Sequence, residues 1–135
     1  LGDAKRAAAD GHKPMARLVS YAVSCVPNEI MGEGPIPASK LALKKAGLTL
    51  DKIDVVESNE AFAAQAIAVA RGLGLDMAKT NPNGGAIALG HPIGCSGAFI
   101  ATKAVYELHR TGGRYALVTM CIGGGQGIAA VFERL

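Results

Sequence analysis

The sequence predicts an α/β fold in which helices are layered on a mixed β-sheet. Helix-like and strand-like segments alternate along its 135 residues, a length that suits one domain. Hydrophobic residues make up 50% of the chain, aromatic residues only 4%, and Trp is absent. The core must therefore be built from Ala, Val, Ile and Leu, which favours helices packed closely on a sheet. A short glycine-rich loop joins the last two strand-like segments, so we expect them to pair antiparallel.

A helix, a strand and a loop are predicted at the start of the chain. Residues 3–10 form the end of a helix, because Gly11 and Pro14 stop it. Residues 18–26 have the sequence LVSYAVSCV, which is apolar and rich in β-branched side chains and predicts a buried strand. Residues 31–37 contain two prolines and two glycines, a composition that predicts a loop.

The remaining elements continue the alternation. A helix begins at Pro37 or Ser39 and ends at Gly47, because proline suits a first turn and glycine a C-cap. Residues 59–73 have the helical sequence NEAFAAQAIAVARGL, with Asn59 as the simplest N-cap. The other predicted elements are strands over 53–57, 115–120 and 128–133, a loop over 80–94 and a helix over 96–110.

Charge and composition exclude several classes of protein. The formal net charge is +3, and the basic residues are scattered among acidic ones with little aromatic interleaving, so nucleic acid is not indicated as a partner. No apolar stretch is long enough to cross a membrane. The three cysteines, Cys25, Cys95 and Cys121, are far apart and odd in number, so neither a disulfide framework nor a metal site is predicted. We therefore expect a reducing, cytoplasmic environment.

Two glycine-rich segments carry the candidate reactive side chains. His91 lies in residues 88–94 (ALGHPIG), and Cys121 opens residues 121–127 (CIGGGQG). Glycine lets a backbone approach a ligand closely, but it weakens any regular element that contains it. This clustering predicts a site that combines a thiol, an imidazole and free backbone N–H groups.

Other interpretations of these segments remain open. Cys121 alone is typical of a small buried hydrophobic residue, and His91 alone is typical of a turn residue that bonds to backbone. The glycines after Cys121 favour a thiol beside exposed N–H groups, an arrangement that binds an oxyanion. A nucleotide site matches weakly, because residues 123–127 lead into a strand and residues 90–97 lack a Gly-Lys-Ser/Thr sequence.

Three blocks are more specific together than any one of them: residues 59–63 (NEAFA), 84–94 (GGAIALGHPIG) and 121–127 (CIGGGQG). Together they resemble the thiolase family, most closely its bacterial acetyl-CoA acetyltransferases and β-ketothiolases. Residues 31–40 (MGEGPIPASK) also resemble the family, so the resemblance covers nearly the whole chain. It implies Claisen condensation of two acyl-CoA molecules, or thiolytic cleavage of a 3-ketoacyl-CoA. It further implies acyl-CoA and CoA as substrates, no cofactor, and a homo-oligomer, dimer or tetramer.

The resemblance also implies a fold of two similar halves. Each half has a five-stranded mixed sheet between helices, with strand order 3-2-4-5-1 and the fifth strand antiparallel. Residues 1–135 would be the C-terminal half, a fragment without its first strand and without the N-terminal catalytic half. The strands that start near Leu18, Ile53, Tyr115 and Ile128 would then be the second to fifth.

Each site residue acquires a role from this resemblance. His91 matches the histidine that activates the nucleophilic cysteine and then helps to hold the thioester oxygen, and Asn59 matches the residue that fixes a water molecule there. Cys121 matches the acid/base thiol at the methyl carbon, and the N–H of Gly123 matches a donor of the second oxyanion hole. The substrate-binding positions near the acyl group are Met31 and Phe62.

One part of the thiolase pattern is absent from this chain. The family's nucleophile lies in the N-terminal half, and Cys25 lies within a predicted strand with no Ser-Gly-Leu sequence after it. We therefore expect no acyl transfer by this chain alone. A non-catalytic module that binds CoA or a nucleotide, or an inactive scaffold fragment, is the alternative. The presence of His91, Asn59 and Cys121 together argues against a scaffold.

Overall fold

The computed structural model describes residues 2–135. In chain order, its elements are α1 (Ala4–Ala9), β1 (Ala16–Cys25), the 3₁₀ helix η1 (Asn28–Glu33), α2 (Pro35–Ala46), η2 (Leu50–Lys52), β2 (Val55–Ser58), α3 (Ala63–Leu73), α4 (Ala86–Leu89), α5 (Ser96–Thr111), β3 (Tyr115–Ile122) and β4 (Gln126–Arg134). In this part of the chain, no helix has the length and apolar character needed to cross a membrane.

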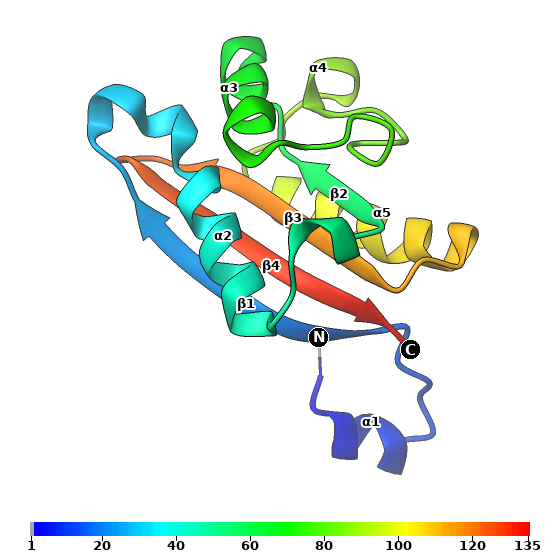
Figure 1. Ribbon diagram of the computed structural model, residues 1–135. Helices are drawn as coiled ribbons and strands as arrows, with labels where there is room; N and C mark the ends of the chain where they lie inside the picture. Colours follow the sequence, from blue (N-terminus) through cyan, green and yellow to red (C-terminus); the bar gives the residue numbers. More distant parts are fainter. Residues whose placement is uncertain (1) are drawn as a thin grey trace.

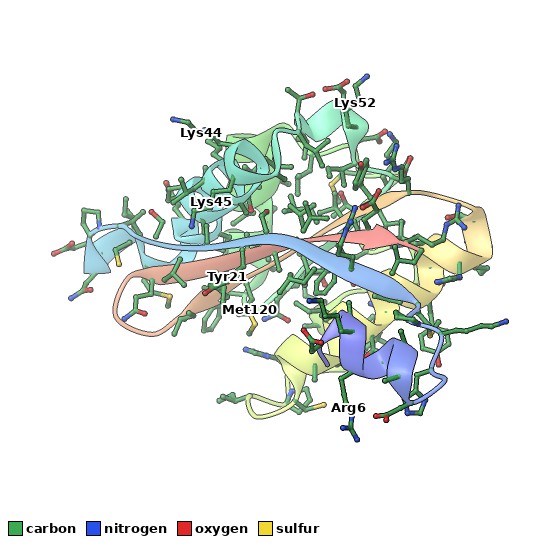
Figure 2. All side chains as sticks on the ribbon, turned by 90° about the horizontal axis from the view of Figure 1, so that it is seen from below. Arg6, Tyr21, Lys44, Lys45, Lys52 and Met120 are labelled. Carbon is green, nitrogen blue, oxygen red and sulfur yellow. The ribbon has the colours of Figure 1, made fainter. Side chains whose placement is uncertain are left out.

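The four strands form one mixed sheet with helices on both faces, as predicted. Their order is β1-β4-β3-β2; β2 and β3 are parallel, and β4 is antiparallel to both of its neighbours. Helix α2 covers one face and α5 the other (Figure 1). Lys44 and Lys45 of α2 lie on one side of the sheet, and Tyr21 and Met120 lie on the other (Figure 2). The α/β class and the antiparallel hairpin are confirmed.

The expected place of the strand near Leu18 is wrong. As a second strand it would lie inside the sheet, but β1 lies at the edge and pairs only with β4. In the order 3-2-4-5-1 it therefore takes the place of the first strand, which is not missing. The third place is held by a single parallel bridge between Val56 and Thr80. A one-residue bridge has no strand pattern of its own in the sequence. The strand near Leu18 was therefore assigned to the second place instead of the first.

The core consists of small and aliphatic side chains on each face of the sheet. Ala38, Ala42 and Leu43 of α2 pack on Leu117 and Val131 on one face, with neither alanine exposed. On the other face, α5 buries Ile100, Ala104 and Leu108, which are spaced four residues apart. Alanines at these contacts let the helices approach the sheet closely, which explains how a chain so poor in aromatic residues packs.

Two local predictions need correction. Residues 28–33 form the 3₁₀ helix η1, and α2 begins at Pro35, because prolines at the first and third helical positions lack only N–H groups that a helix leaves unbonded. The predicted burial of the strand over 18–26 is also wrong, since Ala22 is its one fully buried residue. An edge strand that α5 does not cover keeps most of its side chains accessible.

The start of α2 lies directly against the start of β4, backbone against backbone. A Cβ atom on Gly34 would lie 2.6 Å from the carbonyl oxygen of Gln126, and a Cβ atom on Gly127 would overlap the backbone of Gly34. Both positions therefore require glycine. This contact fixes η1 and α2 against the β3–β4 hairpin, where the glycine-rich loop of Cys121 lies.

Candidate functional site

The site residues gather at one end of the sheet, at the C-terminal ends of the parallel strands β2 and β3. Asn59 follows β2 directly, and Cys121 is the penultimate residue of β3. Ser58 pairs with Thr119 in the register of these strands, and the N–H of Asn59 donates to the carbonyl of Thr119 at 2.9 Å. Asn59 and Cys121 therefore lie on adjacent segments at one edge, a common place for ligand sites in α/β sheets.

Asn59 and His91 are in direct contact. The side-chain nitrogen Nδ2 of Asn59 lies 3.5 Å from Nε2 of His91. On the other side of the ring, Nδ1 lies 2.6 Å from Oγ of Ser96, and this hydroxyl donates to the carbonyl oxygen of Pro92 at 3.0 Å. A hydroxyl has one hydrogen, so Oγ of Ser96 accepts from Nδ1–H of His91. With the hydrogen on Nδ1, the lone pair of the imidazole lies on Nε2.

The loop that carries His91 is held at both ends. Gly90 ends α4 with φ 94° and ψ 162°, a conformation open essentially to glycine alone. Beyond His91, the carbonyl of Pro92 accepts from the N–H groups of Cys95 and Ser96 at 2.8 and 2.9 Å, which starts α5. The glycine and the helix start together fix the direction of the imidazole.

The predicted start of the helix at Asn59 is wrong, and Asn59 is not its N-cap. Helix α3 begins at Ala63, because the N–H of Asn59 is bonded to β3. In addition, the carboxylate of Glu60 bonds to the loop over residues 81–87. That carboxylate accepts from Nδ2 of Asn81 at 3.2 Å and from the N–H of Ile87 at 3.1 Å. Residues 59–62 therefore form a bend that points Asn59 toward His91.

Asn81 joins the loop that leads to His91 to the end of β2, and sequence reasoning missed it. Its Oδ1 accepts from the N–H of Ser58 and its Nδ2 donates to the carbonyl of Ser58, both at 2.9 Å. Its φ of 47° places the residue in a turn, which the sequence NPNGG does indicate. Ser96 was also missed, because a serine at a helix start is ordinarily interpreted as a cap.

Cys121 and Gly123 lie at the same edge, on the β3–β4 hairpin. Cys121 is half-buried with a free thiol, so it is not a fully buried core residue. Gly124 and Gly125 have φ of 72° and 81°, which a three-residue hairpin loop accommodates only with glycines, and Gly123 is exposed. Within residues 2–135, no hydrogen bond joins Cys121 to His91.

Met31 and Phe62 lie on two segments that pack together beside the site. Phe62 precedes α3 with 64% of its surface exposed, and Met31 lies in η1, partly exposed. The two segments meet where Gly32 faces Gln65: a Cβ on that glycine would lie only 3.0 Å from Cγ of the glutamine. Ile87 and Ile93, before and after His91 in the sequence, are also exposed.

Comparisons with known proteins agree on one family. A family model described as "Thiolase, C-terminal domain" matches residues 12–134. The β-ketothiolase BktB of Cupriavidus necator is 65% identical over 125 residues, which are 93% of this chain and 32% of that protein. A 3-oxoadipyl-CoA/3-oxo-5,6-dehydrosuberyl-CoA thiolase of Escherichia coli is 56% identical over 137 residues, which are 100% of this chain and 34% of that protein.

Solved structures give the same result. The crystal structure of human mitochondrial 3-ketoacyl-CoA thiolase superposes with a TM-score of 0.96 and 53% identity, over 98% of this chain and 34% of the human one. A second crystal structure of that human enzyme, with the same TM-score and coverage and 54% identity, contains CoA. This chain spans about a third of the length of these relatives.

Proposed function

Because this chain belongs to the thiolase family, we propose that it supplies one half of the active site of an enzyme that transfers acyl groups between CoA thioesters. The reaction is the condensation of two acyl-CoA molecules or the thiolytic cleavage of a 3-ketoacyl-CoA. The observation that carries this proposal is the contact between Asn59 and Nε2 of His91. It joins an amide donor to the ring nitrogen that carries the lone pair, because Nδ1 of the ring faces Ser96.

In the acyl-transfer step, His91 acts as a general base. Its Nε2 takes the proton of a cysteine thiol supplied by the part of the protein upstream of this chain. The thiolate attacks the thioester carbonyl while the protonated Nε2 points a donor at the thioester oxygen, and Asn59 holds a water molecule as the second donor. The bond to the CoA sulfur then breaks, and CoA takes the proton from Nε2 and leaves as a thiol. Donors already aimed at a developing oxyanion are the strongest single contribution to such reactions.

In the carbon–carbon step, Cys121 is the acid/base group. For condensation, its thiolate removes a proton from the methyl group of a second acetyl-CoA, and the resulting enolate attacks the acyl-enzyme. The bond to the nucleophilic cysteine breaks, and this cysteine leaves as a thiolate that regains the proton now held by Cys121. For cleavage, the thiol returns that proton to the departing enolate. The exposed backbone of Gly123 lies two residues away and offers its N–H to the enolate oxygen. Weak carbon acids ionise near neutral pH only where such a donor is in place.

The proposal includes the substrates and the setting of the reaction. Acyl-CoA and CoA are substrates, and no resident metal or cofactor takes part. Met31 and Phe62 contact the acyl portion, the complete protein is a homo-oligomer, and it acts in the cytoplasm. The three free thiols support a reducing compartment.

A chimera tests this function directly. We would join this chain to the upstream two-thirds of the β-ketothiolase BktB, in place of the segment that it matches. The assay is cleavage of acetoacetyl-CoA by free CoA, followed as loss of enolate absorbance. We expect turnover by the chimera, none by the chain alone, and none by a chimera that carries His91→Ala. A folded chimera that binds CoA without cleaving acetoacetyl-CoA would refute the proposed function in favour of a binding module.

A further inference from the structure

A buried ion pair lies beside the Asn59–His91 contact. Nζ of Lys103 lies 2.9 Å from Oε2 of Glu57, and the two side chains are only 13% and 1% exposed. Glu57 lies in β2, two residues before Asn59. Lys103 lies in α5, the helix whose first residue is Ser96. The pair therefore connects the strand that ends just before Asn59 with the helix that orients His91.

Lys103 also contacts the loop that leads to His91. Its Nζ donates to the carbonyl oxygen of Gly84 at 2.5 Å, in the loop that leads through α4 to His91. One ammonium group thus bonds to a strand end and to a loop, from a helix that itself holds Nδ1 of His91. These are the three segments whose relative position sets the distance between Asn59 and His91.

Electrostatics alone does not explain why this pair is buried. Burial raises the pKa of Glu57, and the hydrogen bond from Lys103 opposes that rise. Replacing a buried ion pair by well-packed apolar side chains is often neutral or stabilising, because both charges lose their hydration. A buried pair with directed hydrogen bonds can instead impose one geometry on the groups that it joins.

The second oxygen of Glu57, Oε1, has no hydrogen-bond partner within the described residues, and Glu57 lines a small cavity. A cavity of about 10 Å³ lies between Glu57, Asn59, Gly90 and Lys103, among other residues. This volume is close to the smallest that holds one water molecule, and a buried carboxylate oxygen is a strong acceptor. The cavity fits a single water that donates to Oε1.

We propose that Glu57, Lys103 and one buried water molecule position Asn59 and His91 for catalysis. Lys103 ties the strand end to the loop before His91, and the water fills the gap beside Asn59. Glu57 and Lys103 are positioning residues, since neither is placed in contact with substrate. The kinetic consequence rests on the proposed function, whereas the orientation of His91 can be measured without it.

The first experiment measures the imidazole in this chain. The double variant Glu57→Gln/Lys103→Met removes both charges together, so no unpaired charge is left buried. We expect ¹⁵N spectra of His91 to change from one tautomer, protonated on Nδ1, to a mixture of tautomers. The matched control is Arg110→Gln, which breaks the ion pair of α5 with the buried Glu107 and should leave His91 unchanged. An unchanged His91 in the double variant would overturn the proposal.

If the double variant does not fold, Glu57→Gln alone decides the same question. This change keeps the volume and one acceptor for Lys103, and thermal unfolding shows whether the fold is intact. The spectrum of His91 should again show mixed tautomers. A single Nδ1-protonated form in this folded variant would contradict the positioning role.

The second experiment measures kinetics in the chimera. We expect the double variant to lower kcat roughly ten- to hundredfold, because small displacements of catalytic groups have effects of that size. KM for acetoacetyl-CoA and the melting temperature should stay near those of the parent chimera, and Arg110→Gln should leave kcat unchanged. An unaltered kcat in the double variant would refute the proposal. An inactive parent chimera would refute the proposed function instead, and the spectra of His91 would still decide this inference.

Discussion

The hydroxyl of Ser96 lies 2.6 Å from Nδ1 of His91 and donates its own hydrogen to the carbonyl of Pro92. Because this hydrogen is already used, the hydroxyl accepts from the ring, and the lone pair of the imidazole is placed on Nε2 beside Asn59. A residue outside the recognisable motifs therefore determines which nitrogen of His91 can act as a base.

Replacing Ser96 by alanine should lower kcat of the chimera about five- to tenfold, the effect of losing one hydrogen bond. The ring would then populate both tautomers, of which only one presents a base on Nε2. Ser20→Ala is the control, because its hydroxyl also donates to a carbonyl, that of Ala42, away from the site. Equal kcat values for the two variants would show that Ser96 has no part in orienting His91.

Cys121→Ala should slow the exchange of acetyl methyl protons with deuterated water in the chimera by roughly 100-fold or more, because it removes the proposed acid/base group. Acylation of the upstream nucleophile, measured as release of CoA, should remain, whereas His91→Ala should impair it. Cys95→Ala, which removes an exposed thiol, should leave both steps intact. Exchange at the parent rate in Cys121→Ala would make this thiol a packing residue.

Gly90→Ala should lower the free energy of unfolding by about 1–3 kcal/mol, because φ of 94° and ψ of 162° strain any side chain. Gly94→Ala is a matched control in the same loop. A Cβ atom would meet nothing within 4 Å at either position, and Gly94 has no positive φ. Urea unfolding of this chain measures both. Equal stabilities would indicate that the loop relaxes without strain.

Acid should weaken the fold through Glu107. Its hydrogen bond with Arg110 lowers the pKa of this carboxyl from 4.5 to about 2. A depressed pKa stabilises the fold fully above 4.5, and this stabilisation is lost as the pH falls toward 2. Since the guanidinium of Arg110 is exposed, we expect a loss of about 1 kcal/mol. Urea unfolding between pH 5 and pH 3 should show a shallower dependence in Arg110→Gln, and identical slopes would contradict this assignment.

The face of the sheet that α5 leaves open should promote self-association of this chain. Tyr21 and Val23 are 61% and 46% exposed there, next to Ala130 and Ile128 of β4, and such apolar patches favour association. Tyr21→Lys should shift the mass seen by light scattering toward the monomer. Tyr106→Lys should not, although Tyr106 is equally exposed, because it lies across α5 from the buried Ala104. The same mass for both variants would exclude this face.

The features that could be predicted depend on neighbours in the sequence. Gly47 ends its helix with φ 67°, and the glycine loop before Gln126 joins an antiparallel hairpin, because each signal acts within a few residues. The resemblance of the motifs likewise identified the family. It also predicted that Asn59 and His91 act together, and their side chains lie 3.5 Å apart.

The features that could not be predicted depend on distant partners. Asn59 looks like an N-cap until its N–H is bonded to Thr119, and nothing near Asn81 indicates that its amide pairs with Ser58. The place of β1 was wrong for the same reason, since β4, its one partner in the sheet, lies at the other end of the sequence. Burial of Glu57 and Lys103 likewise has no local signal in the sequence.

The position of β4 between β1 and β3 has a consequence during protein synthesis. Ala16 pairs with Arg134, so β1 leaves the ribosome long before its partner exists. At typical rates of translation the delay is roughly 5–20 s. For that time both hydrogen-bonding edges of β1 are open to other nascent chains, and the sheet closes only when the last strand is inserted into its middle. We therefore expect correct folding of this chain during synthesis to depend on chaperones that bind emerging strands.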